Sequence, residues 1–101
     1  MLALAMLGTA SSAQASDKLV GEVFAFGGNY CPRHSREADG EILKVAMYES
    51  LFVILGTTYG GDGRTTFAVP DLRPENAAGE KVRFEGVRYC IVYKGKFPSR
   101  N

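Results

Sequence analysis

The fold of this chain is decided by one stretch, LFVILGTTYGGDGRTTFAVPDLR, which covers residues 51–73. An apolar run comes first and gives way at Gly56 to a polar loop, Thr57–Thr66, which contains the glycines of GGDG. Closely spaced glycines favour positive backbone φ angles, so this loop is not expected to be regular over its whole length. Phe67–Val69 then predicts a short strand that ends at Pro70.

A turn closes the stretch. Asp71 has the short carboxylate that commonly accepts hydrogen bonds from nearby backbone N–H groups in such turns. We expect the side chain of Leu72 to anchor the turn.

One helix is predicted just before the glycine loop. Large apolar residues fall at i, i+3, i+4 and i+7, the spacing that places them on one helical face; they are Tyr48, Leu51, Phe52 and Leu55. The helix is expected from about Ala46 to Leu55, with Gly56 as the positive-φ residue that ends it. Its start has no capping oxygen at Val45 or Ala46. We interpret the apolar stripe as core and not as a cofactor pocket.

The remaining strand signals lie on both sides of the stretch. Runs rich in β-branched and aromatic residues predict strands; they are 19–26, 41–43, 81–84 and 87–93. Residues 33–40 are polar and turn-like and end in Asp39-Gly40, a dipeptide typical of hairpins. The chain is therefore predicted to be one small α+β domain with short strands and one central helix.

The N-terminal segment has the features of a leader. Residues 1–15 carry no charge, are apolar from Leu2 to Leu7 and end in the A-x-A pattern Ala13-Gln14-Ala15. We expect a signal peptide over 1–15 and a mature domain over 16–101, exported to the periplasm or beyond the cell; a buried N-terminal helix is the alternative. No run is long enough to predict a membrane span in the mature form. A net charge of +1 over 101 residues does not indicate nucleic acid as a partner.

Two cysteines, Cys31 and Cys90, lie 59 positions apart. In an exported chain they are expected to form a disulfide, for which loop entropy gives about 4 kcal/mol of stabilisation. A reactive thiol is the less favoured alternative, because there is no C-x-x-C motif and His34 has no evident orienting partner.

The glycine loop is the candidate ligand-binding site. It lacks the G-K-[ST] of a phosphate-binding loop and follows a helix where such a loop would precede one. Asp62 and Asp71 are the only carboxylates nearby, fewer than calcium requires. The structural reading, a turn that needs glycine, is favoured over a ligand site formed by Tyr59, Gly60, Gly61, Asp62, Gly63 and Arg64.

Catalytic and metal sites have little support. His34, Glu37 and Asp39 are better explained as a solvated turn than as a metal or acid–base cluster. No G-x-S-x-G elbow is present. We therefore predict a protein that is not an enzyme, with no cofactor and no metal.

Basic residues gather near the C-terminus with aromatic residues between them. The basic residues are Arg83, Arg88, Lys94, Lys96 and Arg100. Alternation along a strand would place one set toward solvent, so we interpret them as the surface of an edge strand and not as a nucleic-acid site.

Four segments in this order resemble the phage tail collar domain family of tail-fibre and microcystin-dependent-type bacterial proteins. They are GEVFAFGGNYCP at 21–32, DGEIL at 39–43, the stretch at 51–73, and RYCIVYKGKFPSRN at 88–101. The resemblance implies a tail-collar-like fold, a structural or interaction role, and a homotrimer as one option for assembly.

The chain departs from the family pattern at three places. Pro32-Arg33-His34-Ser35 stands where the family has Pro-x-Gly-Trp, and Leu43-Lys44-Val45-Ala46 where it has Leu-Pro-Ile-Ser. The long variable region expected after Arg73, where the resemblance would place receptor contacts, is contracted to 74–81.

Two functions follow as hypotheses. The first is a non-enzymatic structural or interaction module of tail collar type in an exported bacterial protein, of prophage descent. The second is a secreted protein that binds carbohydrate or another surface ligand through the 57–66 loop, with Tyr59, Asp62 and Arg64 as contacts. Protein or surface glycan is the expected partner.

Overall fold

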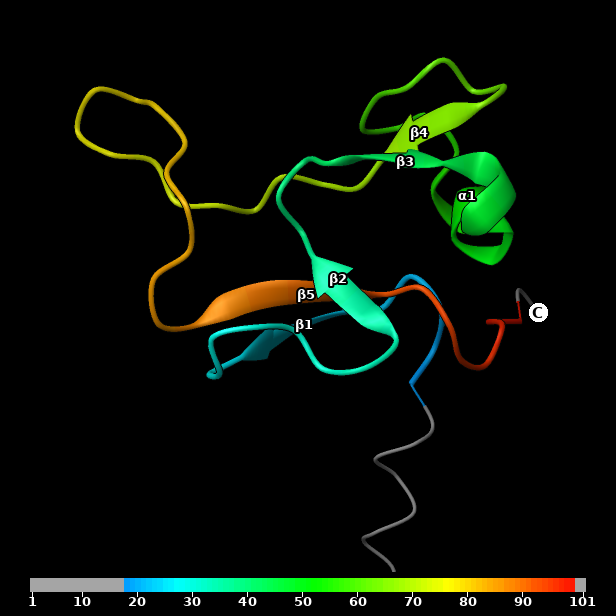
Figure 1. Cartoon of the computed structure of the whole chain (residues 1–101), viewed down its shortest axis with the longest axis horizontal. Helices are drawn as coiled ribbons and strands as arrows, with labels where there is room; N and C mark the ends of the chain where they lie inside the picture. Colours follow the sequence, from blue (N-terminus) through cyan, green and yellow to red (C-terminus); the bar gives the residue numbers. More distant parts are fainter. Residues whose placement is uncertain (1–17, 100–101) are drawn as a thin grey trace, which may run out of the picture.

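Two small antiparallel sheets and one short helix form the domain in the computed structural model, which describes residues 18–99 (Figure 1). The predicted α+β class is confirmed. The predicted signal peptide at 1–15 lies outside the described residues. Within residues 18–99, no helix has the length and apolar character needed to cross a bilayer.

The first sheet has three strands in the order β1-β5-β2: β1 is Val23–Phe26, β5 is Arg88–Val92 and β2 is Ser35–Glu37. Both neighbours run antiparallel to β5, and Cys90 is opposite Phe24 on one side and Glu37 on the other. The predicted C-terminal strand is therefore confirmed. Its predicted place at an edge is wrong, because β5 is the central strand.

The second sheet pairs β3, Ile42–Lys44, with β4, Thr66–Ala68, so that Leu43 is opposite Phe67. Helix α1, Glu49–Leu55, lies between these strands in sequence.

The helix starts three residues later than predicted. A 3-10 turn, Val45–Met47, comes first. Tyr48 then occupies the N-cap position without a side-chain hydrogen bond. Gly56 ends the helix with φ 56° as expected.

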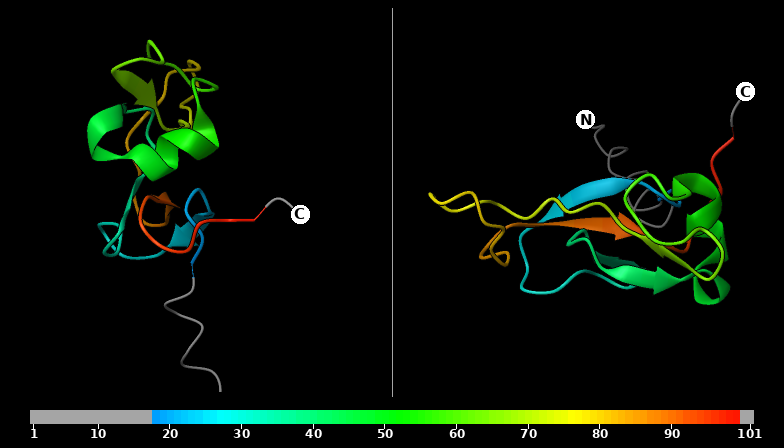
Figure 2. Two further views of the ribbon diagram at one scale, coloured as in Figure 1. Left: turned by 90° about the vertical axis from the view of Figure 1, so that its right-hand side faces the viewer. Right: turned by 90° about the horizontal axis from the view of Figure 1, so that it is seen from above.

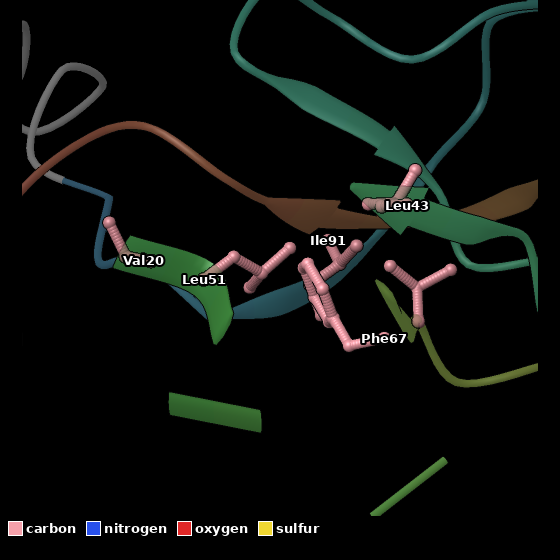
Figure 3. Packing of buried hydrophobic residues seen from close by; sticks show 6 residues of the cluster. Val20, Leu43, Leu51, Phe67 and Ile91 are labelled. Atoms are coloured by element: carbon pink, nitrogen blue, oxygen red, sulfur yellow. The ribbon is translucent and has the colours of Figure 1, made fainter. Parts of the chain in front are cut away.

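One hydrophobic core lies between the two sheets and the helix (Figure 3). Its buried members come from β3, β4, β5, α1 and the segments beside β1 and β4; they are Val20, Leu43, Leu51, Phe67, Val69 and Ile91. Tyr48, Phe52 and Leu55 pack against this cluster, which confirms that the predicted helical stripe is core. The glycine loop that leads to Phe67 is thereby attached directly to the core.

The segment at 33–40 is not simply a turn. Ser35–Glu37 forms β2, whose polar sequence gives no strand signal and whose pairing depends on β5. Asp39-Gly40 does not close a hairpin, because β2 and β3 belong to different sheets. Instead, the backbone of Asp39 forms an isolated antiparallel β-bridge with that of Asp71.

The contracted region after Arg73 forms a short arm at the end of the molecule opposite α1 (Figures 1 and 2). Glu75 and Lys81 form an isolated antiparallel β-bridge between their backbones, and the Asn76 side-chain oxygen accepts the N–H groups of Ala78 and Glu80 at 2.9 and 3.0 Å. Residues 81–84 are outside any strand, so the strand predicted there is wrong. The arm therefore keeps its shape through one β-bridge and the Asn76 hydrogen bonds, and it buries little surface.

Candidate functional site

Asp62 organises the glycine loop. Its Oδ1 atom accepts the backbone N–H groups of Arg64, Thr65 and Thr66 at 2.8, 2.8 and 2.9 Å. The Thr65 hydroxyl donates to Oδ2 at 2.9 Å. The Arg64 N–H, followed by those of Thr66 and Thr65, holds the pKa of Asp62 well below its usual range. The Asp62 carboxylate therefore holds the loop closed through hydrogen bonds to the loop's own residues.

The glycines of this loop are required by the backbone. Gly60, Gly61 and Gly63 all have positive φ angles. At Gly61 a side chain would also collide, because a Cβ there would be 2.3 Å from the Cα of Phe67. The Gly60 carbonyl accepts the N–H of Ala68 at 3.1 Å. These contacts fix the loop against β4.

The six candidate ligand residues share one loop but not one pocket. The Tyr59 side chain is 50% exposed. Arg64 lines a hollow of about 500 Å³ that also involves Lys44 and Glu49. Tyr59 and Asp62 do not line this hollow. Arg64 is thus the one predicted contact that the geometry places beside a cavity.

The turn after β4 is held by an ion pair. Arg73 donates from Nε to Asp71 Oδ1 at 2.9 Å and from Nη2 to Oδ2 at 2.8 Å, and this lowers the Asp71 pKa to about 2. Asp71 Oδ1 also accepts the backbone N–H of Arg73 at 3.2 Å, which confirms the predicted turn hydrogen bond. The predicted anchor is wrong: the Leu72 side chain is 41% exposed, and its backbone N–H instead donates to Ala38 O at 2.8 Å.

A disulfide and a buried arginine fasten the 27–34 segment to β5. Cys31 and Cys90 are joined with an S–S distance of 2.05 Å. Two residues before Cys90, Arg88 donates from Nε to Gly28 O at 2.9 Å and forms an ion pair with Glu37. Arg88 is only 8% exposed, so the interpretation of this residue as a solvent-facing surface charge is wrong.

His34, Glu37 and Asp39, the residues of the alternative metal or acid–base cluster, each contact a different residue. The His34 ring lies 6.3 Å from that of Tyr93. Glu37 pairs with Arg88, and Asp39 Oδ1 accepts the Glu41 N–H at 3.1 Å. Among residues 18–99, no three His, Cys, Asp or Glu side chains are grouped to hold a metal ion.

One polar contact between the sheets had no distinct signal in the sequence. Arg36 on β2 pairs with Glu41 just before β3 and donates from Nη1 to the Tyr48 hydroxyl at 3.1 Å. The Tyr48 ring in turn lies 5.1 Å from that of Tyr93. Nothing in the sequence indicates that Arg36 and Glu41 pair, because the pairing depends on how the sheets meet.

Comparison with known proteins identifies one family. The family model described as Phage Tail Collar Domain matches residues 21–77. This range includes β1, the helix, the glycine loop and the Asp71–Arg73 turn. No curated protein matches the chain. No solved structure matches it either.

Proposed function

The chain belongs to the phage tail collar domain family, and on that premise we propose that it is a non-enzymatic structural or interaction module of an exported protein. A domain of this family implies a structural or binding module. The observation that carries the proposal is the closure of the glycine loop on itself: Asp62 accepts four hydrogen bonds from loop residues. This motif is accordingly a scaffold element.

Turnover assays test the non-enzymatic part. The mature protein is expected to show no saturable turnover with glycoside or ester substrates. Saturable turnover that a single substitution between Gly60 and Arg64 abolishes would contradict it. Arg83→Ala is the control variant, because Arg83 lies outside the loop.

Export is supported by two observations. Residues 13–15 offer an A-x-A cleavage site, and the Cys31–Cys90 disulfide fits an oxidising compartment. Expression of the whole chain in a Gram-negative host, followed by intact-mass measurement of the periplasmic fraction, tests the proposal. The expected product begins at Ser16 and has no free thiol, whereas an uncleaved chain in the cytoplasm would contradict it.

Self-association is the third part of the proposal. Met47 and Val53 are 70% and 67% exposed on and beside α1, so this end of the domain offers apolar side chains to another copy. Light scattering on the mature protein is expected to give a mass three times that of the monomer. A monomer across the whole concentration range would remove the trimer.

A second candidate function rests on the hollow beside Arg64. The hollow is lined by a guanidinium, a hydroxyl and a carboxylate, from Arg64, Thr65 and Glu49. These groups can form hydrogen bonds with the hydroxyl groups of a sugar. The proposal is a secreted protein that binds a surface glycan there. A glycan array probed with the mature protein and with Arg64→Ala tests it. Binding that Arg64→Ala abolishes supports the proposal, and silence across the array removes it.

A further inference from the structure

A separate hollow of about 430 Å³ lies at the C-terminal end of β5, beside Val92. Its walls come from three parts of the chain: the 32–35 turn, residues 92–95, and the start of the described chain at Lys18 with Phe24. The volume is within the range of small-molecule sites. None of the glycine-loop residues lines it, so it is independent of the site discussed above.

The side chains around this hollow are strongly cationic. Three cations, Lys18, Arg33 and Lys94, line it beside the His34 ring, and no acidic side chain of the described residues does. The formal net charge of the chain is only +1, so this is a local concentration of positive charge. No described residue forms an ion pair with Arg33 or Lys94. Glu22 is close to Lys18 in the sequence but does not line the hollow, and its Oε1 atom accepts the Leu19 N–H at 3.0 Å.

The backbone at His34 is unusual. His34 has φ 70°, the only positive φ among the described residues other than glycine. The turn closes by a hydrogen bond from Ser35 N–H to Pro32 O at 3.1 Å, and Tyr93 N–H donates to His34 O at 2.9 Å. Glycine adopts this conformation far more readily than histidine does. The wall of the hollow therefore has an imidazole at a position whose backbone φ favours glycine.

The backbone of the 32–35 turn is held in place before any ligand arrives. Cys31, next to the turn, is bonded to Cys90 on β5. Ser35 pairs with Val92 in the sheet. Arg33 lies on this turn, so its backbone loses less conformational entropy on binding than it would on a free loop.

Apolar side chains complete the lining. Phe24, Pro32 and Val92 contribute to it, and the Lys18 ammonium lies 4.3 Å from the centre of the Phe24 ring. From this combination we propose that the hollow binds a sugar-sized ring that carries an oxyanion group. The cations bind the oxyanion, and the apolar wall contacts the body of the ring.

Titration of the isotope-labelled mature protein with glucose 6-phosphate, followed by NMR, tests the proposal. We expect saturable shifts confined to Lys18, Phe24 and residues 32–35 and 92–95, with millimolar affinity that weakens in high salt. Glucose, which has no charge, is expected to give no shifts. Inorganic phosphate is expected to bind about tenfold more weakly. Equal affinity for inorganic phosphate would overturn the role of the apolar wall, and no shift at these residues would overturn the site.

Variants separate this site from general charge effects. Arg33→Gln with Lys94→Gln is expected to weaken glucose 6-phosphate binding at least about tenfold. Arg83→Gln removes a charge at the other end of β5 and is expected to leave binding unchanged; equal losses for both would overturn the proposal.

His34→Gly keeps the backbone conformation accessible and removes the imidazole, so the protein is expected to fold and to bind several-fold more weakly. Unchanged binding by this variant would remove His34 from the site. Arg64→Ala is expected to have no effect here, which keeps the test distinct from that of the glycan-binding loop.

Discussion

Gly61 lies against the backbone of Phe67, so closely that a Cβ on Gly61 would be 2.3 Å from the Phe67 Cα. The Phe67 side chain is fully buried in the core. This close contact between the glycine loop and the core leaves no space for any other residue at position 61.

Gly61→Ala is expected to destabilise the domain by about 3 kcal/mol, because the left-handed φ and the collision with Phe67 both add a cost. Urea unfolding followed by circular dichroism measures the change. Gly79→Ala is the matched control: it has φ +84° but open space around it. Its expected cost is about 1 kcal/mol. Equal losses for the two variants would contradict the close contact.

Acid is expected to destabilise the fold through Asp62 and Asp71. Both have a pKa below the ordinary value in the folded state, in Asp71 about 2. Their contribution to the free energy of unfolding is complete above about pH 4, the ordinary Asp pKa. It is lost as the pH falls toward and through the pKa values of the folded state. Burial raises the pKa of Asp39, which acts in the opposite sense.

Urea midpoints measured from neutral pH downward test this. Asp62→Asn and Asp71→Asn are expected to be less stable at neutral pH and to show a flatter decline on acidification. A profile as steep as that of the natural sequence in both variants would show that other carboxyl groups cause the acid sensitivity.

Reduction of the Cys31–Cys90 disulfide is expected to lower stability by about 4 kcal/mol, because the bond closes a long loop of the unfolded chain. The comparison is urea unfolding with and without reductant, and Cys31→Ser with Cys90→Ser serves as a control that reductant cannot affect. Two free thiols in protein made under oxidising conditions would contradict the cross-link.

Arg88→Met is expected to cost about 3 kcal/mol, since it leaves Glu37 without its cation and Gly28 O without its donor. Arg83→Met, at an exposed position, is expected to change stability by less than about 0.5 kcal/mol. Thermal unfolding measures both. A harmless Arg88→Met would show that the ion pair does not hold the 27–34 segment to β5.

The helix and the turn were predictable because their signals are local. The spacing of apolar residues from Tyr48 to Leu55 identified the face of the helix that packs on the core, and Gly56 marked the end of the helix. The start predicted at about Ala46 was three residues early, because the 3-10 turn at Val45–Met47 depends on how β3 leads into α1. The Asp71 hydrogen bond likewise depends only on residues within the turn.

Features made by distant partners were not predictable. β2 is polar and becomes a strand only because β5 lies beside it. Arg88 looks like a surface charge until Gly28 and Glu37 are brought to it.

The cationic hollow had no signal in the sequence for the same reason. It draws on Lys18, Arg33 and Lys94, which lie far apart in the sequence. The sequence therefore revealed the scaffold better than the surfaces that the scaffold presents.

Thermal unfolding of Asp62→Ala beside Arg64→Ala is the most direct test of whether the GGDG loop is a scaffold element. Asp62 accepts the hydrogen bonds that close the loop, whereas the Arg64 side chain extends beside the hollow and contributes only its backbone N–H. We predict a clearly lower Tm for Asp62→Ala and an unchanged Tm for Arg64→Ala. An Asp62→Ala protein as stable as the natural sequence would contradict the scaffold role of the loop.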